Sequence, residues 1–235
     1  MTDSFSITRG FPLFISNVWL LKSQGITLLI DTSHAAARRP LLRWLNRNGI
    51  ARPGDLSAIV LTHRHSDHAG NSAFLRERLH CPVCLHENDA PFLDGRMPPP
   101  PLSRGLGGPW DKACCALEDR LPAKSPVDRT FTAAEPPFDL EVVETFGHTQ
   151  GSVMLYHRPS QTLFSGDSLL TAMPPLMMRE RFCLAVAAYS NDQHACHQAT
   201  LAFLADPPPI TRICPGHGPL VDRDARNKLI RFASA

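Results

Sequence analysis

The chain has 235 residues, and its 24 basic and 22 acidic side chains leave a formal net charge of +2. This length suits one domain with a sizeable core. The scattered, nearly balanced charge gives no electrostatic footprint for a nucleic acid or an anionic membrane. Seven cysteines are an odd number in a chain too long for a disulfide-stapled scaffold, which favours a reducing compartment. We therefore expect a cytoplasmic protein that binds neither nucleic acid nor membrane.

Strands and helices are expected to alternate through the first 90 residues. The apolar stretch 11–21 lacks a basic region and a cleavage site, so it is interpreted as a strand and not as a signal peptide or membrane span. The turn KSQG separates two apolar runs and predicts a β-hairpin ending at Asp31. The pattern then predicts a helix, a strand, a helix and a strand over residues 35–50, 56–63, 69–80 and 81–88.

The pattern changes at about residues 91–127, which we interpret as an insertion in a single domain spanning 1–235. Its first part, MPPPPLSRGLGGPW, is rich in proline and glycine. A short helix is predicted afterwards, in DKACCALEDRL. Long ordered loops in compact domains are often lids or binding loops, and a disordered surface insertion is the alternative.

Regular structure is expected again after the insertion. A strand in FDLEVVETFGHT ends at His148, and two strands around the turn RPSQ lead to Asp167. An amphipathic helix follows with Ser190 as the expected N-cap, and a last strand in ITRICPGHG ends at His217. The similar order of elements in 16–90 and 130–218 predicts two related α/β halves.

The segment LTHRHSDHAGN carries the strongest chemical signal. His63, His65, Asp67 and His68 lie within six consecutive positions, and such groups are costly to bury unless something pairs with them. His63 and His65 are one residue apart, so both rings can face one side of an extended backbone. Imidazole and carboxylate ligands without thiolate suit Zn²⁺, Mn²⁺ or iron.

Three further candidate ligands stand where apolar runs end. His148, Asp167 and His217 are each followed by small or turn residues, so loops from distant parts of the chain can converge on one sheet edge. Together with the first segment they make seven candidates. That number exceeds what one tetrahedral ion needs and suits two ions that share a carboxylate.

These motifs resemble those of the metallo-β-lactamase-fold superfamily. HRHSDH matches the family pattern H-x-H-x-D-H, and FGHTQGS, FSGDS and PGHG follow in the family's order. LLIDTS resembles the family's first motif, whose aspartate supports the site. The resemblance extends from about Asn17 to Gly218 and rests on an ordered, specific set of motifs.

The resemblance implies an α/β fold, a four-layer αββα sandwich of two mixed β-sheets flanked by helices. It also implies two divalent metal ions, with zinc expected and manganese or iron as alternatives. A hydroxide bridging the two ions would be the nucleophile, and Asp67 would orient it and carry a proton. By this carry-over the first ion is held by His63, His65 and His148, the second by Asp67, His68 and His217, with Asp167 bridging both.

Departures from individual branches narrow the expected substrate. Asp167 stands where class B1 β-lactamases carry cysteine, and Leu170 stands where many acyl-homoserine lactonases carry tyrosine. The G-C-G segment common in glyoxalase II and persulfide dioxygenases is not found after Asp167. Only 17 residues follow Gly218, fewer than the glutathione-binding domain of glyoxalase II needs. A small-molecule ester, thioester or lactone hydrolase is therefore expected.

Two other functions stay open at this point. His63, His148 and Asp167 alone would make a two-histidine, one-carboxylate triad, as in a mononuclear iron dioxygenase acting on persulfides. A protein that binds metal without turnover is the second alternative. The run MPPLMM, at 173–178, is either an apolar pocket for an acyl chain or ordinary packing.

Overall fold

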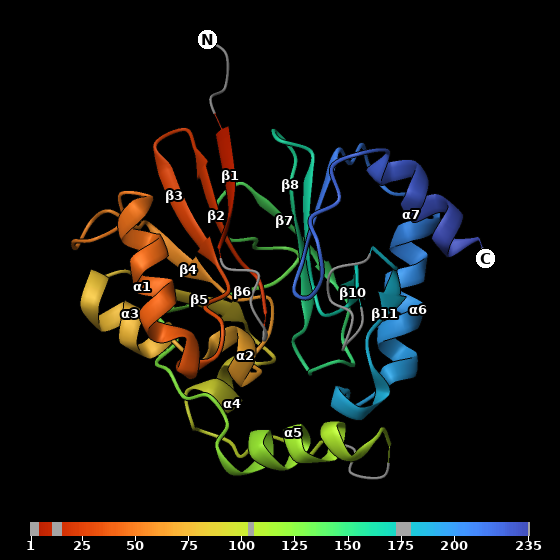
Figure 1. Cartoon of the computed structure of the whole chain (residues 1–235), viewed down its shortest axis with the longest axis horizontal. Coiled ribbons are helices and arrows are strands. Elements are labelled where there is room, and N and C mark those ends of the chain that lie inside the picture. Colours follow the sequence, from red (N-terminus) through yellow and green to blue (C-terminus); the bar gives the residue numbers. More distant parts are fainter. Residues whose placement is uncertain (1–4, 11–15, 103–105, 173–179, 235) are drawn as a thin grey trace.

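Two β-sheets lie face to face, and helices cover the outer face of each (Figure 1). The computed structural model describes residues 5–10, 16–102, 106–172 and 180–234. The expected four-layer αββα sandwich is confirmed. The predicted pocket in 173–178 lies in a segment outside the described residues, so the structure does not test it.

The first sheet has six strands in the order β1-β2-β3-β4-β5-β6. They are β1 (Phe5–Gly10), β2 (Val18–Ser23), β3 (Ile26–Ile30), β4 (Ala58–Val60), β5 (Val83–His86) and β6 (Arg129–Phe131). The first three strands are antiparallel, and β3 to β6 are parallel. Trp19 pairs with Ile30 in the predicted hairpin. Strand β1 was not expected from the sequence; its half-exposed residues pair along β2 at the sheet edge.

The second sheet has four strands in the order β12-β9-β8-β7. They are β7 (Leu140–Glu144), β8 (Val153–His157), β9 (Thr162–Gly166) and β12 (Arg212–Pro215). Strand β12 joins β9 in parallel, whereas β7, β8 and β9 are antiparallel. A short ribbon of β10 (Leu169–Leu170) and β11 (Cys183–Leu184) lies beside them.

Three apolar layers fill the spaces between the four structural layers. Leu41 and Leu45 of α1 (Arg38–Arg47), with residues of α3 (Ser72–Leu79), pack on one face of the first sheet. Trp19, Leu155 and Phe164 belong to the central layer between the sheets. The third layer joins the second sheet to α6 (Gln193–Ala205) and α7 (Ala225–Ala233). Burial of these aliphatic faces is the main term that holds the sheets in place.

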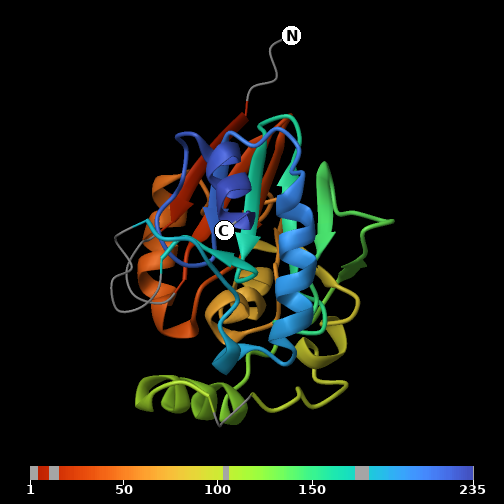
Figure 2. The same ribbon diagram turned by 90° about the vertical axis from the view of Figure 1, so that its right-hand side faces the viewer.

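The segment 91–127 contains an ordered helix, α5 (Pro109–Arg120), after the short α4 (Ala90–Leu93). Helix α5 runs across one end of the sandwich and passes beneath both sheets (Figures 1 and 2). Cys115 is fully buried in a small cluster with Leu102 and Ala188. The predicted short helix therefore packs on the body of the protein.

One predicted helix start is wrong. Helix α6 begins after Asp192, whose side chain accepts a hydrogen bond from the Ala195 amide at 3.0 Å. Ser190, the expected N-cap, instead lies near His148 with its hydroxyl 3.1 Å from the ring Nδ1. Ser and Asp have similar N-cap propensities, so the pattern SND could not decide between them. Among the described helices, none is long and apolar enough to cross a membrane.

Candidate metal centre

All seven candidate ligands meet at one edge of the two sheets. His63 follows β4, His65 is the N-cap residue of α2 (Ser66–Ala69), and Asp67 and His68 lie within that helix. His148, Asp167 and His217 follow β7, β9 and β12. The ligand atoms form three overlapping groups, each within 4.8 Å: His63, His65 and His148; His63, His68 and Asp167; and Asp67, His68 and His217. Asp167 therefore lies where the outer two groups meet.

His63, His65 and His148 form a dry group of imidazoles, exposed by 4% or less. The His65 Nδ1 is 3.1 Å from the His148 Nε2, and the His63 and His65 ring centroids are 4.9 Å apart. Burial lowers the pKa of His148 to about 4. Burial and neighbouring histidines hold the pKa values of His63 and His65 well below their usual range. These rings are neutral at pH 7, the form in which imidazole binds a metal.

Hydroxyl groups orient two of these rings. The Thr62 hydroxyl is 3.1 Å from the His63 Nδ1, and the Ser190 hydroxyl is 3.1 Å from the His148 Nδ1 while donating to the Val186 carbonyl. Such outer contacts fix the ring plane and the tautomer of a metal-binding histidine.

The second group combines carboxylates with imidazoles and is nearer to solvent. The His217 Nε2 lies 3.1 Å from Asp67 and 3.3 Å from Asp167. The His68 Nε2 lies 3.2 Å from the other oxygen of Asp167. The side chains of Asp67 and His217 are 27% and 15% exposed. This end of the site, here called the entrance, is therefore the one that solvent reaches.

In the second group the neighbouring carboxylates raise the pKa values of the histidines, whereas the pKa values in the imidazole group are lowered. Burial disfavours the charged form of His217, but Asp167 and Asp67 raise its pKa to about 9. Asp167, Asp67 and Asp31 overcome burial in the same way at His68 and raise its pKa well above the usual range. The facing histidines hold the pKa of Asp167 well below its ordinary value despite its burial. Without a metal, these histidines carry protons that a bound cation would replace.

Asp31 supports the site from the end of β3, as the first-motif resemblance implies. Its carboxylate accepts hydrogen bonds from the Thr62 amide at 2.8 Å and the Thr62 hydroxyl at 2.9 Å, and it lies 2.8 Å from the His68 Nδ1. The backbone of Asp31 has φ of 60°, a region that non-glycine residues rarely occupy and that is common at functional sites.

Asp89 is a supporting residue that no sequence motif predicts. Fully buried, it accepts hydrogen bonds from the Arg64 amide at 3.0 Å, the Thr149 hydroxyl at 2.6 Å and the Gly151 amide at 2.8 Å. It therefore ties the HRHSDH loop to the loop of His148. Burial raises its pKa, which Arg64 opposes. A single aspartate just after a strand, in HEND, resembles any turn residue, so only the fold shows its role.

The first glycine of PGHG permits the close approach of two candidate ligands. A Cβ atom on Gly216 would lie 2.3 Å from an Asp167 oxygen and 2.7 Å from the His68 ring. Neither neighbour can move without leaving the group. Any side chain at this position would therefore separate Asp167 from His68.

The site contains buried polar atoms that match a metal. The Nε2 atoms of His63 and His65 have no hydrogen-bond partner among the described residues, and the His68 Nε2 and Asp167 Oδ1 atoms have only each other, 3.2 Å apart and without the geometry of a hydrogen bond. Leaving such atoms unpaired is costly, and native proteins rarely do so without a ligand or water. The donor set of five imidazoles and two carboxylates is one that zinc, manganese and iron accept. The residues present therefore fit the metal centre that the sequence predicts.

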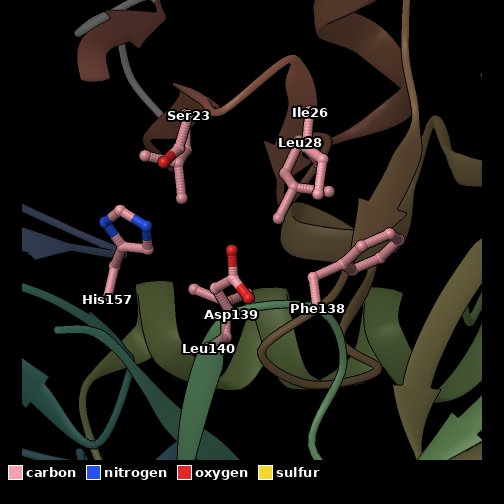
Figure 3. A pocket seen from close by; sticks show the side chains of 8 residues that line it. Ser23, Ile26, Leu28, Phe138, Asp139, Leu140 and His157 are labelled. Carbon is pink, nitrogen blue, oxygen red and sulfur yellow. The ribbon is translucent and has the colours of Figure 1, made fainter. Parts of the chain in front are cut away.

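A small pocket between the sheets lies at the opposite ends of the strands (Figure 3). Ser23, Asp139 and His157 point toward it alongside apolar side chains. Its volume of about 10 Å³ has room for one water molecule. It is too small for an organic substrate, so the metal centre remains the candidate functional site.

Comparison with known proteins agrees with this geometry. The model of the metallo-beta-lactamase superfamily matches residues 11–220. The probable metallo-hydrolase YybB of Bacillus subtilis is 28% identical over 68% of this chain and 64% of its own length. The hydroxyacylglutathione hydrolase of Thiobacillus denitrificans is 26% identical over 88% of this chain and 62% of its own. The chain thus spans a little under two thirds of each of these relatives.

Solved structures show the same fold. A di-iron-bound form of TTHA1623 superposes with a TM-score of 0.66 at 26% identity, covering 94% of this chain and 99% of that one. The B3 metallo-beta-lactamase BLEG-1 has a TM-score of 0.65 at 24% identity, covering 98% of this chain and all of the other. Its likeness concerns the fold alone. The family model, the ordered motifs and the four-layer sandwich together show that this chain belongs to the metallo-beta-lactamase superfamily.

Proposed function

We propose that this protein is a metal-dependent hydrolase that binds two ions and cleaves a small-molecule ester, thioester or lactone. One observation carries the proposal: seven nitrogen and carboxylate ligands from four loops converge in overlapping groups within 4.8 Å. Relatives described as probable metallo-hydrolases and hydroxyacylglutathione hydrolases support the reaction class.

Each ligand set would hold one ion. His63, His65 and His148 would bind the first ion through neutral rings, whereas Asp67, His68 and His217 would bind the second. Asp167 would contact both, since its Oδ1 atom lies 3.2 Å from His68 of the second set and its Oδ2 atom lies 3.7 Å from His148 of the first. Zinc is our first expectation; manganese and iron suit the same donors, and the di-iron form of TTHA1623 supports testing iron. When bound, the ions would supply an activated water and polarise the substrate oxygen.

Asp67 is the proposed catalytic residue of the chain. Its carboxylate lies at the entrance, 3.1 Å from the His217 Nε2, and His68 and His217 lower its pKa against the effect of burial. An ionised carboxylate in this place can accept a hydrogen bond from the attacking water and take its proton. It can then deliver that proton to the leaving oxygen or sulfur at the entrance.

Thioester cleavage is the acyl chemistry that we expect first. Two of the relatives are named hydroxyacylglutathione hydrolase, and their matches cover 66% and 88% of this chain. A reducing, cytoplasmic location agrees with the seven cysteines, which are all free thiols in the structure.

The first experiment is metal analysis by elemental mass spectrometry on untagged protein purified without added metal. Two zinc, manganese or iron ions per chain, together with turnover of a thioester, ester or lactone panel, would support the proposal. One iron per chain with oxygen uptake on a persulfide, and no hydrolysis, would select the dioxygenase. Bound metal without turnover in any assay would select the non-catalytic metal-binding protein.

A further inference from the structure

Helix α5, from the segment 91–127, contacts the supports of both candidate ligand sets. We propose that it is a structural strap, a helix that holds two ligand loops of the metal centre in place, and that Glu118 is a positioning residue for Asp67 and His68. This inference rests on the proposed metal binding. It assigns a role to an insertion whose described residues contribute no candidate ligand.

Glu118 provides the contact with the first loop. Both of its oxygens lie 3.2 Å from the Ser66 amide, and the Ser66 hydroxyl also donates to this carboxylate. Ser66 is the first residue of α2, and its N-cap, His65, makes no side-chain capping bond. Glu118 therefore satisfies a helix-end donor that the local sequence leaves open.

The place of the Glu118–Ser66 hydrogen bond in the ligand loop determines which candidate ligands it positions. Asp67 and His68 directly follow Ser66 in α2, so a shift of this short helix moves both side chains. Asp89 holds the Arg64 amide on the other side of His65 at 3.0 Å. Two carboxylates from different elements thus fix alternate amides of one ligand loop.

The other part of α5 contacts the second loop. The Tyr189 hydroxyl donates to Asp111 at 2.8 Å, and the Cys115 thiol donates to the Ala188 carbonyl at 3.0 Å. The next residue, Ser190, lies against the His148 ring. One rigid helix therefore bridges the element that carries Asp67 and the element that orients His148.

Burial indicates that the Glu118 contact is built into the structure. Glu118 is mostly buried, and burial raises its pKa to about 6. The outward positions of the same helix include Trp110 and Leu117, exposed by 71% and 51%. Placing a carboxylate on the inward face is costly unless it has a specific partner, and here that partner is Ser66.

The test is a metal titration of apo-protein by calorimetry, using Zn²⁺ as the probe. Glu118→Ala should lower the affinity for the second ion, on Asp67, His68 and His217, by about 10–100-fold, the usual effect of losing an outer support. The first ion, on the three-histidine set, should change by less than about threefold. Glu118→Gln keeps an oxygen that can accept from the Ser66 amide and should recover most of the loss.

Hydrogen exchange supplies the second measurement. Glu118→Ala should speed exchange of the α2 amides, while exchange in the β8 and β9 strands stays unchanged. Glu77→Ala, on an exposed position of α3, is the matched acid control, and Lys112→Ala tests an exposed position of α5. Both controls should behave as the wild type does.

The other arm of the strap is tested by Tyr189→Phe. This change removes the bond to Asp111 while keeping the ring, and it should weaken the first ion more than the second. Two bound ions with unchanged affinities in both Glu118→Ala and Tyr189→Phe would overturn the strap. A wild-type protein that binds no ion would instead overturn the proposed function. Equal weakening of both ions in Glu118→Ala, with faster exchange throughout the chain, would show a general stability effect and reject the positioning role.

Discussion

The two candidate ligand sets differ in charge and in contact with solvent. The set of His63, His65 and His148 is dry and neutral, with pKa values lowered by burial. The set of Asp67, His68 and His217 is partly exposed and consists of ionised groups that pair with one another. A cation can enter the first set without displacing protons, whereas it must replace the protons of His68 and His217 in the second. We therefore expect the two ions to bind with different affinities and different pH dependence.

Removing a ligand of the dry set should have the largest effect. His148→Ala should abolish binding of the first ion and weaken the second, because Asp167 then lacks its shared cation. Hydrolysis should fall by at least about 10³-fold, the scale of losing a main charge-stabilising group. Elemental analysis and kcat/KM provide the measurement. His194→Ala, on an exposed face of α6, should change neither, and a two-ion His148→Ala protein would contradict the assignment.

A change in the exposed set should separate the two ions. His217→Ala should leave one ion in the dry set and remove the second, since it deletes one of three ligands at the entrance. We expect kcat to fall by about 10²-fold, within the range for a positioned acid–base or charge-stabilising group. Stoichiometry distinguishes this variant from His148→Ala. Loss of both ions in His217→Ala would show that the two sets bind as one unit.

Asp31→Asn tests the contact between strand β3 and the exposed set. An amide keeps the size of the side chain but removes the charge that stabilises His68, so the second ion should bind about 10–100-fold more weakly. The three-histidine set should lose less affinity, because Asp31 reaches it only through the Thr62 hydroxyl that orients the His63 ring. Zinc titration of the apo-protein measures both affinities. Equal losses of zinc affinity at both ligand sets would contradict the expected difference between them.

The smallest expected effect concerns the buried carboxyl of α5. Burial raises the pKa of Glu118 from 4.5 to about 6, so the folded state binds the proton more tightly than the unfolded state. The contribution of Glu118 to the stability of the wild type should therefore fall as pH rises from about 4.5 to about 6, by at most about 2 kcal/mol. Glu118→Gln should lack this decrease. Urea unfolding of both metal-free proteins across this range tests the sign, and parallel curves would contradict it.

Much of the fold and the site followed from local patterns. The hairpin before Asp31, the helices 38–47 and 193–205, and the buried strands each have a clear period and clear ends. The ligand motifs could be recognised because one chemistry needs several rare residues at fixed spacing. The structure brings all seven candidate ligands together, although their binding of metal stays a prediction.

Other features depend on contacts between distant segments. Asp89 and Glu118 hold the ligand loops through backbone amides, and an acceptor for an amide leaves no spacing rule in the sequence. Strand β1 takes its place by pairing with β2 at the sheet edge. The two-residue strands β10 and β11 are too short to carry any period. Tertiary packing decides all of these features.

The origin of the ligands gives the metal centre a mechanical role. His63, His65, Asp67 and His68 follow strands of the first sheet, whereas His148, Asp167 and His217 follow strands of the second. Bound ions would therefore cross-link the two halves of the sandwich. At a free metal concentration 1,000 times Kd, each site adds about 4 kcal/mol of stability by mass action. Removal of the metal by a chelator would then weaken the association of the two sheets. Two fragments produced by cleavage in the segment 91–127 would bind each other more tightly with metal than without it.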